Sequence, residues 1–310
     1  METGIKIGLL FLLFTSTAFS QQIKKDLPNI IYIYADDLGY GELGCYGQQK
    51  IKTPNLDRMA AEGIRFLQHY SSAPVCAPSR AMLMTGKHAG HSYIRGNYEL
   101  GGFADSAERG QMPLPTEAFT VADLLKQKGY KTALVGKWGL GMGNTEGSPL
   151  KHGFDYYYGY LDQKQAHNFY PTHLWENDKW DALNQPFINV HKKLDSANVI
   201  DADFDYFKGK DYAPALMTGK ALHFIDKNKS NPFFLYLPYT IPHASLQAPD
   251  DWINKYVGQF DEKPYYGQQG YASVKYPLSA YAAMITYLDA QVGIIMEKIK
   301  QLGLDENTLI

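Results

Sequence analysis

Three short apolar runs constrain the fold of this chain more than any other feature. Residues 29–34 (Asn-Ile-Ile-Tyr-Ile-Tyr) and 233–239 are aromatic and β-branched without a polar face, as in strands buried on both sides of a sheet. Residues 131–135 also have strand character and follow a capped helical segment. Helical patterns occupy residues 120–128, 212–226 and 277–302. This alternation from Asn29 to Ile310 predicts an α/β fold in which helices sandwich a mainly parallel sheet.

Polar side chains follow each of these strands. Asp36 and Asp37 come directly after the first, Lys137 lies just beyond the second, and His243 follows the third. Open α/β sheets build their sites at the carboxyl ends of strands, so we expect functional groups there. Adjacent carboxylates are costly unless a cation lies between them, and oxygen ligands suit Ca²⁺ or Mg²⁺. A solvated Asp-Asp turn explains the same two residues equally well.

The composition narrows the class of protein. With 310 residues and 45% hydrophobic content, the chain is long enough for one large α/β domain, alone or with an extension. A formal charge of −2 and the lack of a basic block argue against nucleic acid as a partner.

Residues 1–20 have the pattern of a secretory signal peptide. Lys6 precedes the apolar run 7–14, and the small residues around Phe19 precede Gln21, where cleavage is expected. The apolar run is too short to cross a bilayer, and no cysteine near Gln21 can carry a lipid. We therefore expect an exported protein, periplasmic or secreted, with no membrane attachment after cleavage.

The segment 75–86 (Val-Cys-Ala-Pro-Ser-Arg-Ala-Met-Leu-Met-Thr-Gly) has the strongest functional pattern. The run from Arg80 to Met84 favours a helix that Gly86 would end, so Cys76 is predicted at or just before a helix N-terminus. Free N–H groups at such a terminus, with Arg80 one turn on, favour an anion beside the sulfur. A small buried cysteine without chemistry is the alternative.

This segment resembles the signature of the cysteine-type sulfatases, Cys-x-Pro-Ser-Arg followed by Thr-Gly, here Cys76 to Arg80 and Thr85-Gly86. The resemblance implies an alkaline-phosphatase-like fold and hydrolysis of sulfate esters. It also implies that a maturation enzyme oxidises Cys76 to formylglycine, whose hydrate is a geminal diol. One hydroxyl of the diol attacks sulfur, and loss of the proton from the other hydroxyl then expels sulfate.

The same resemblance implies a metal site. Sulfatases carry an Asp-Asp pair at this place as metal ligands, which assigns Asp36 and Asp37 to a divalent cation together with the matured Cys76. Ca²⁺ is expected rather than Mg²⁺.

Charge stabilisation and proton transfer are also assigned by the resemblance. The run 136–141 is similar to the family's Gly-Lys-Trp-His-Leu-Gly, so Lys137 is expected to stabilise charge on the sulfate together with Arg80. His243 follows a proline, as in the family, and is the candidate general acid for the leaving oxygen. Gly139 departs from the pattern, because many sulfatases have histidine there. Two residues remain candidates for its role: His91 and His167.

Two polar stretches are candidates for contacting the substrate. Loop 87–97 contains His91 and Arg95, and the aromatic segment 153–180 contains His167 and Asn168. Aromatic faces beside amides and histidines suit sugar rings, so a sulfated glycan or sulfated small molecule is the expected substrate. A polar surface loop and an insertion that packs its own rings explain the two stretches equally well.

The end of the chain suggests a partial domain. Residues 277–302 repeat apolar residues at spacings of three and four, Gly303 ends the pattern, and residues 308–310 begin a strand. In sulfatases such a strand leads to an Asp-Asn pair of metal ligands, a second lysine and a smaller C-terminal domain. We therefore expect residues 21–310 to be an incomplete N-terminal catalytic domain, metal-poor and inactive as it stands.

Two other functions remain open. A phosphate-ester hydrolase of the same superfamily would share the fold, although serine or threonine usually replaces Cys76 there. A non-catalytic glycan-binding relative would use the aromatic segment 153–180. A disulfide between the two cysteines, Cys45 and Cys76, would exclude formylglycine altogether.

Overall fold

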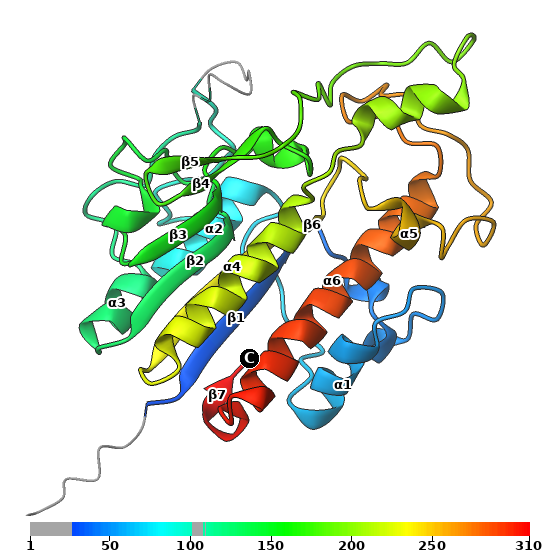
Figure 1. The fold of residues 1–310 in the computed structure, drawn as a ribbon. Coiled ribbons are helices and arrows are strands. Elements are labelled where there is room, and N and C mark those ends of the chain that lie inside the picture. Colours follow the sequence, from blue (N-terminus) through cyan, green and yellow to red (C-terminus); the bar gives the residue numbers. More distant parts are fainter. Residues whose placement is uncertain (1–26, 101–107, 109) are drawn as a thin grey trace, which may run out of the picture.

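The computed structural model describes residues 27–100, 108 and 110–310, so the expected signal peptide lies outside the described residues. Within them, seven strands form one sheet in the order β5-β4-β3-β2-β6-β1-β7 (Figure 1). The strands are β1 (Asn29–Asp36), β2 (Lys131–Lys137), β3 (Tyr156–Tyr160), β4 (His173–Glu176), β5 (Lys179–Ala182), β6 (Phe233–Pro242) and β7 (Thr308–Leu309).

Most neighbouring strands of the sheet run parallel. β1 pairs in parallel with β6 and β7, and β2 pairs in parallel with β3 and β6. Only the β3–β4 and β4–β5 pairs among the described strands are antiparallel. The predicted mainly parallel sheet is confirmed, and the carboxyl ends of β1, β2 and β6 therefore meet at one edge.

β6 shows how an uninterrupted apolar run supplies two cores. All ten of its residues are buried. Phe233 and Leu235 pack into the core on the side of α4 and α6, whereas Phe234 and Tyr236 pack into the core that contains α2. Successive strand residues point to opposite faces of the sheet. A strand in which apolar and polar residues alternate would therefore have exposed one of its faces to water. Each such side chain contributes about 1.5–3 kcal/mol by leaving water.

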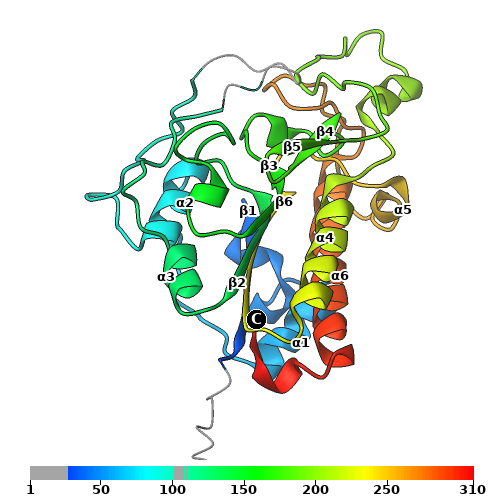
Figure 2. The ribbon, with the colours of Figure 1, turned by 60° about the vertical axis from the view of Figure 1, so that its left-hand side comes forward.

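Helices cover both faces of the sheet, as predicted. α2 (Cys76–Thr85) and α3 (Val121–Gln127) lie on one face, and α1 (Pro54–Glu62), α4 (Ala213–Asn228) and α6 (Pro277–Gln301) lie on the other (Figure 2). The short α5 (Asp250–Ile253) packs against α6, with Trp252 edge-on to Tyr287.

The helix ends follow the predicted caps within one or two residues. Thr120 Oγ1 accepts a hydrogen bond from Asp123 N, and Asp123 Oδ2 accepts one from Thr120 N, which starts α3 with a capping box. α2 ends at Thr85, and its C-cap Gly86 has a φ of 65° and donates its N–H to Met82 O.

The long helix α6 is part of the core. Its length and hydropathy would suffice to cross a membrane, but 67% of its most apolar window is buried inside the protein. Ala283, Val292 and Ile295 have no exposed surface. The predicted pattern of apolar residues at spacings of three and four therefore faces the sheet and not a bilayer.

Two facing glycines allow a close approach between the central strands. Gly136 in β2 pairs with Gly159 in β3, and their φ angles are 144° and 141°. A Cβ on Gly136 would lie 2.1 Å from the backbone oxygen of Pro238 in β6. A larger residue at position 136 must therefore push β2 and β6 apart immediately before Lys137.

Replacing Gly136 with alanine should destabilise the fold through this clash. We expect Gly136→Ala to lower the free energy of unfolding by roughly 3 kcal/mol. Gly219→Ala is the matched control, because Gly219 is exposed in α4 and an added Cβ would meet nothing within 4 Å. That change should stabilise by about 0.5–1 kcal/mol. Urea unfolding measures both, and equal stability of Gly136→Ala and the wild type would contradict the prediction.

Candidate active site

Separate segments deliver the predicted catalytic residues to one edge of the sheet. Asp36 ends β1, Lys137 ends β2, and His243 directly follows β6. Cys76 is the first residue of α2, and Arg80 lies one turn further along that helix. These five residues come from four segments that are far apart in the sequence, and only the fold brings them together.

Asp36 is the centre of the cluster. Its Oδ2 accepts a hydrogen bond from Lys137 Nζ at 2.9 Å and lies 3.2 Å from Arg80 Nη2. Its Oδ1 lies 3.8 Å from the Cys76 thiol, which donates to it. Burial by itself raises the pKa of Asp36, but the charges of Lys137 and Arg80 outweigh this effect and hold that pKa well below its usual value. Asp36 is therefore an ionised carboxylate inside the protein.

The two cations around Asp36 are also buried. Arg80 and Lys137 are each only 1% exposed. Arg80 Nη1 donates to the backbone oxygen of Lys137 at 2.6 Å, and the guanidinium lies 5.5 Å from the centre of the Tyr34 ring. Arg80 Nε has no hydrogen-bond partner among the described residues. Two buried positive charges against one buried carboxylate leave local positive charge that an anion can neutralise.

Cys76 lies at a helix N-terminus, as predicted. Val75 is the N-cap of α2, and Asn97 Oδ1 accepts a hydrogen bond from the N–H of Ala77 at 2.9 Å. Cys45 and Cys76 are both free, so the alternative of a disulfide between them is wrong. Burial raises the pKa of the Cys76 thiol, and the charge of Lys137 offsets this only in part. A thiol in this position is protonated at neutral pH and is a poor nucleophile.

Asp37 and His243 line the more open side of the cluster. Asp37 has a φ of 64°, its side chain is 60% exposed, and its Oδ2 lies 3.5 Å from His243 Nε2. His243 Nδ1 donates to the backbone oxygen of Ala244, so Nε2 is the atom that can take up or release a proton. Burial and the charge of Lys137 lower the pKa of His243, while Asp36 and Asp37 oppose that shift.

His167 belongs to the same cluster. Its ring stacks on His243 with a centroid distance of 4.9 Å and an angle of 12°. Burial and the neighbouring charge of Lys137 lower the pKa of His167 to about 2, so the ring is neutral. Its Nδ1 is buried without a partner in the described part of the chain.

The space beside Gly139, where the family pattern has histidine, is filled by Gln163. A Cβ on Gly139 would lie 2.9 Å from Gln163 Cγ, and Gly139 has a φ of 71°. Of the two histidines considered as a replacement, the structure places His167 at the cluster. Its catalytic role stays a prediction.

Loop 87–97 contains two residues that are predicted to bind substrate, His91 and Arg95. The contacts described for these two side chains are with their own loop and not with the cluster around Asp36. His91 stacks edge-on against His88 at 4.9 Å on the surface. Arg95 is exposed and donates to the backbone oxygens of Ser92 and Gly90. Their roles in substrate binding stay predictions.

The aromatic segment 153–180 is mainly part of the core. Asn168 is 3% exposed, donates to the backbone oxygen of Ile188 and accepts from the N–H of Tyr170, so its amide is used internally. Its role as a substrate contact stays a prediction, although its amide nitrogen and oxygen each already have a partner inside the protein. Most rings of the segment are buried as well: Phe154, Tyr157, Tyr158, Tyr160, Phe169 and Tyr170. An insertion packing its own rings is therefore the better explanation.

Tyr271 is a neighbour of the cluster that sequence reasoning missed. Its ring centre lies 5.3 Å from that of His167 and 6.0 Å from that of His243. No motif surrounds residue 271, and only the folded chain brings it beside residues 167 and 243.

The carboxylates fit part of a metal site. Asp36 Oδ1 and Asp37 supply the hard oxygen donors that a divalent cation prefers. Among residues 27–100, 108 and 110–310, however, no three His, Cys, Asp or Glu side chains form a group that could hold a metal ion. A cation at Asp36 and Asp37 therefore needs further ligands besides these two carboxylates.

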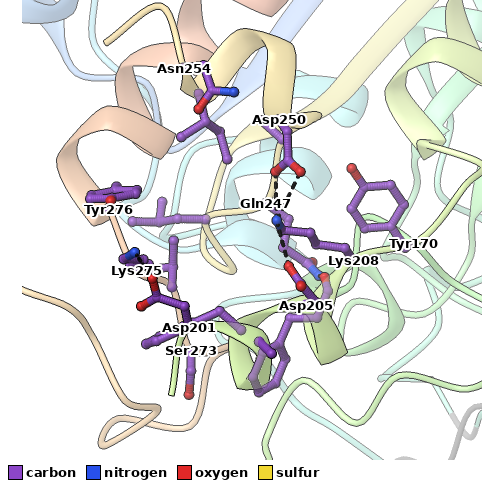
Figure 3. A pocket seen from close by; sticks show the side chains of 17 residues that line it. Tyr170, Asp201, Asp205, Lys208, Gln247, Asp250, Asn254, Ser273, Lys275 and Tyr276 are labelled. Atoms are coloured by element: carbon purple, nitrogen blue, oxygen red, sulfur yellow. Dashed lines mark hydrogen bonds and ion pairs between the residues drawn. The ribbon is translucent and has the colours of Figure 1, made fainter. Parts of the chain in front are cut away.

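A separate cavity of about 380 Å³ lies beside α5 (Figure 3). Asp205 and Asp250 both pair with Lys208 at 2.9 Å on its wall, and Asp201 pairs with Lys275 at 2.6 Å. None of the predicted catalytic or substrate residues lines it. The cavity is therefore distinct from the cluster around Asp36.

Removing the charge of Asp36 should leave two buried cations without a partner. We expect Asp36→Asn to lower the free energy of unfolding by roughly 3–5 kcal/mol at neutral pH. Asp37→Asn is the matched control, because the side chain of Asp37 is exposed. This substitution should change the free energy of unfolding by less than about 0.5 kcal/mol. Urea unfolding in the presence of a chelator measures both, and equal effects would contradict the assignment of Asp36 as the central charge.

The same interaction predicts a dependence on pH. A carboxylate with a depressed pKa stabilises the fold above its unfolded pKa of about 3.9, and this contribution is lost as pH falls through the lower folded value. The stability difference between the wild type and Asp36→Asn should therefore shrink as the pH is lowered below about 4. A difference that stays constant over this range would argue against an ionised Asp36.

Comparison with known proteins agrees with this geometry. The family model described as Sulfatase matches residues 28–310. An arylsulfatase from Klebsiella aerogenes is 30% identical over 331 residues, which cover 93% of this chain and 65% of that enzyme. Steryl-sulfatase from Homo sapiens is 45% identical over 160 residues, which cover 50% of this chain and 27% of the human protein.

A solved structure shows the same fold. The crystal structure of Ps i-CgsB is 30% identical, has a TM-score of 0.70, and covers 91% of this chain and 57% of its own. A second structure of that protein, in complex with k-i-k-neocarrahexaose, matches with a TM-score of 0.69. The chain thus spans between about a quarter and two thirds of the proteins it matches. Because the family model extends over residues 28–310, which include the whole cluster around Asp36, this chain belongs to the sulfatase family.

Proposed function

We propose that this chain forms the catalytic part of an exported sulfatase, which hydrolyses sulfate esters through formylglycine at position 76. One observation carries the proposal. Cys76 begins a helix within 3.8 Å of Asp36, and the buried cations Lys137 and Arg80 lie on the other oxygen of that carboxylate. A sulfate ester group, which carries one negative charge, meets a helix N-terminus and two fixed positive charges when it is brought to Cys76.

The state of the Cys76 thiol supports maturation. Burial raises the pKa of this thiol, so the unmodified residue is not an effective nucleophile at neutral pH. Oxidation to formylglycine would supply a hydrated aldehyde, whose hydroxyl is a suitable nucleophile for sulfur. A maturation enzyme that recognises the segment around Cys76 is the implied partner.

The residues of this chain supply charge and protons for such a reaction. Lys137 and Arg80 stabilise negative charge on the sulfate oxygens, and their burial keeps water from screening them. When the bond between sulfur and the ester oxygen breaks, the leaving oxygen needs a proton. His243 Nε2 would deliver that proton when the ring is protonated beside Asp37, because Nδ1 is committed to the Ala244 carbonyl.

Asp36 and Asp37 would hold the cation, for which we propose Ca²⁺ rather than Mg²⁺. The sulfatase family generally uses a metal ion, and it would supply positive charge to the sulfate. The exposed position of the Asp37 side chain leaves room for the larger and more variable ligand shell of Ca²⁺, whereas Mg²⁺ requires a strict octahedron.

Sulfated carbohydrate is the substrate class that we propose. The support comes from Ps i-CgsB, a 30% identical protein whose structure contains k-i-k-neocarrahexaose. Residues 1–20 have the pattern of a signal peptide, which supports an exported location, periplasmic or secreted. An exported enzyme can reach glycans that occur outside the cell.

Replacing the nucleophile should abolish turnover. In the full-length matured protein, we expect Cys76→Ala to lower kcat for 4-nitrophenyl sulfate by at least about 10³-fold. Cys45→Ala, which changes the other free cysteine, should retain activity. Peptide mass spectrometry across residue 76 should find an aldehyde in place of the thiol. Full activity of Cys76→Ala would refute the mechanism.

Comparing 4-nitrophenyl sulfate with 4-nitrophenyl phosphate separates the two hydrolase classes. A higher kcat/KM for the phosphate ester would favour the phosphate-ester hydrolase. Glycan binding without turnover of either ester, in protein whose residue 76 remains a thiol, would favour a binding protein.

Removing the metal should reversibly remove activity. A chelator should lower kcat/KM by at least about tenfold, and Ca²⁺ should restore it better than Mg²⁺. Asp37→Asn should raise the Ca²⁺ concentration needed for half-maximal activity, because one anionic ligand is lost. Unchanged turnover after metal analysis has shown the protein to be metal-free would rule out this role of the two aspartates.

A further inference from the structure

Tyr271 is carried by a loop that is fixed at several points beside the cluster. Tyr265 and Val274 close the loop by exchanging two backbone hydrogen bonds of 2.9 Å. Within it, Ala272 N donates to Ser245 Oγ at 3.0 Å, which attaches the loop to the segment after β6. The backbone oxygen of Gly270 accepts from His191 Nδ1 at 2.5 Å. The residues on both sides of Tyr271 are therefore held in place.

The ring of Tyr271 lies at a steep angle to the stacked rings of His167 and His243. Its plane makes angles of 63° with His167 and 73° with His243, so it meets both rings edge-to-face. Its side chain is only partly buried, and no hydrogen bond to its hydroxyl occurs within the described residues. Burial raises the pKa of Tyr271, so the hydroxyl keeps its proton and can donate it in a hydrogen bond.

The depth of the surrounding groups indicates which part of a substrate Tyr271 would meet. The charged groups suited to sulfate, Arg80 and Lys137, are 1% exposed and lie at the bottom of the site. Tyr271 and the exposed Asp37 lie toward solvent. Since the alcohol released from a sulfate ester must leave toward solvent, an outer aromatic ring lies on the side of the alcohol and not of the sulfate.

We propose that Tyr271 is a specificity-determining residue, whose ring packs against the organic group that carries the sulfate and whose hydroxyl donates a hydrogen bond to it. The ring suits the C–H face of a sugar or the face of an aryl group, and the hydroxyl suits a ring or hydroxyl oxygen. This inference rests on the proposed sulfatase function and extends it to the side of the leaving group.

Three variants of the full-length matured protein test this contact. Tyr271→Leu removes the aromatic face but keeps an apolar side chain, and Tyr271→Phe removes only the hydroxyl. Tyr265→Phe is the matched control, because its hydroxyl accepts from the N–H of Gln269 in the same loop. The readouts are KM and kcat for 4-nitrophenyl sulfate and for a sulfated oligosaccharide, and the inhibition constant of inorganic sulfate.

We expect Tyr271→Leu to raise KM about tenfold for both esters and Tyr271→Phe to raise it about threefold. The inhibition constant of inorganic sulfate should stay within about twofold of the wild-type value, because free sulfate lacks the organic group. Tyr265→Phe should change neither quantity beyond this margin.

Several outcomes would overturn the inference. An unchanged KM in Tyr271→Leu would show that the ring makes no contact with substrate. Equal increases in KM and in the inhibition constant of sulfate would place Tyr271 on the sulfate instead. Equal losses in Tyr265→Phe would indicate loop order rather than contact. Because each requires an active wild-type protein, failure of the proposed function would appear separately, as no hydrolysis by the wild type.

Discussion

The pairing of one buried carboxylate with two buried cations sets the conditions for the rest of the site. Asp36 remains ionised in the interior because Lys137 and Arg80 lie within 2.9 and 3.2 Å of it. Without that carboxylate, two positive charges would be buried alone, which costs several kcal/mol. With it, they remain charged and fixed beside Cys76. A permanent positive environment for an anion is therefore built into the fold before substrate or metal arrives.

The parallel sheet makes this pairing possible. β1 and β2 are separated by β6 in the sheet, yet all three run in the same direction and end at the same edge. Side chains far apart in sequence, such as Asp36 and Lys137, can then meet beyond the strand ends. Gly136 and Gly159 allow the backbones to approach closely just before Lys137. Gly136, where the strands approach closely, is thus the residue directly before Lys137 in β2.

Local sequence patterns were sufficient for most of the scaffold. The uninterrupted apolar runs correctly indicated β1 and β6, and Thr120 and Gly86 marked helix ends through side-chain capping and a left-handed turn. The β4–β5 hairpin was missed, because its two strands have only four residues each. Its turn does leave a signal, since Asn177 has a φ of 56°, a conformation that asparagine tolerates well.

By itself, the sequence determined the fold class and the segment around Cys76, because strand periodicity, helix caps and a closely spaced motif all depend on neighbouring residues. The surroundings of that segment were decided only by the tertiary structure. His167, not His91, joins His243; Asn168 is used inside the core; and Tyr271 stands beside the histidines. These positions depend on contacts between residues about 20 to 100 apart in the chain, and no local pattern encodes which loops meet when the strand ends converge.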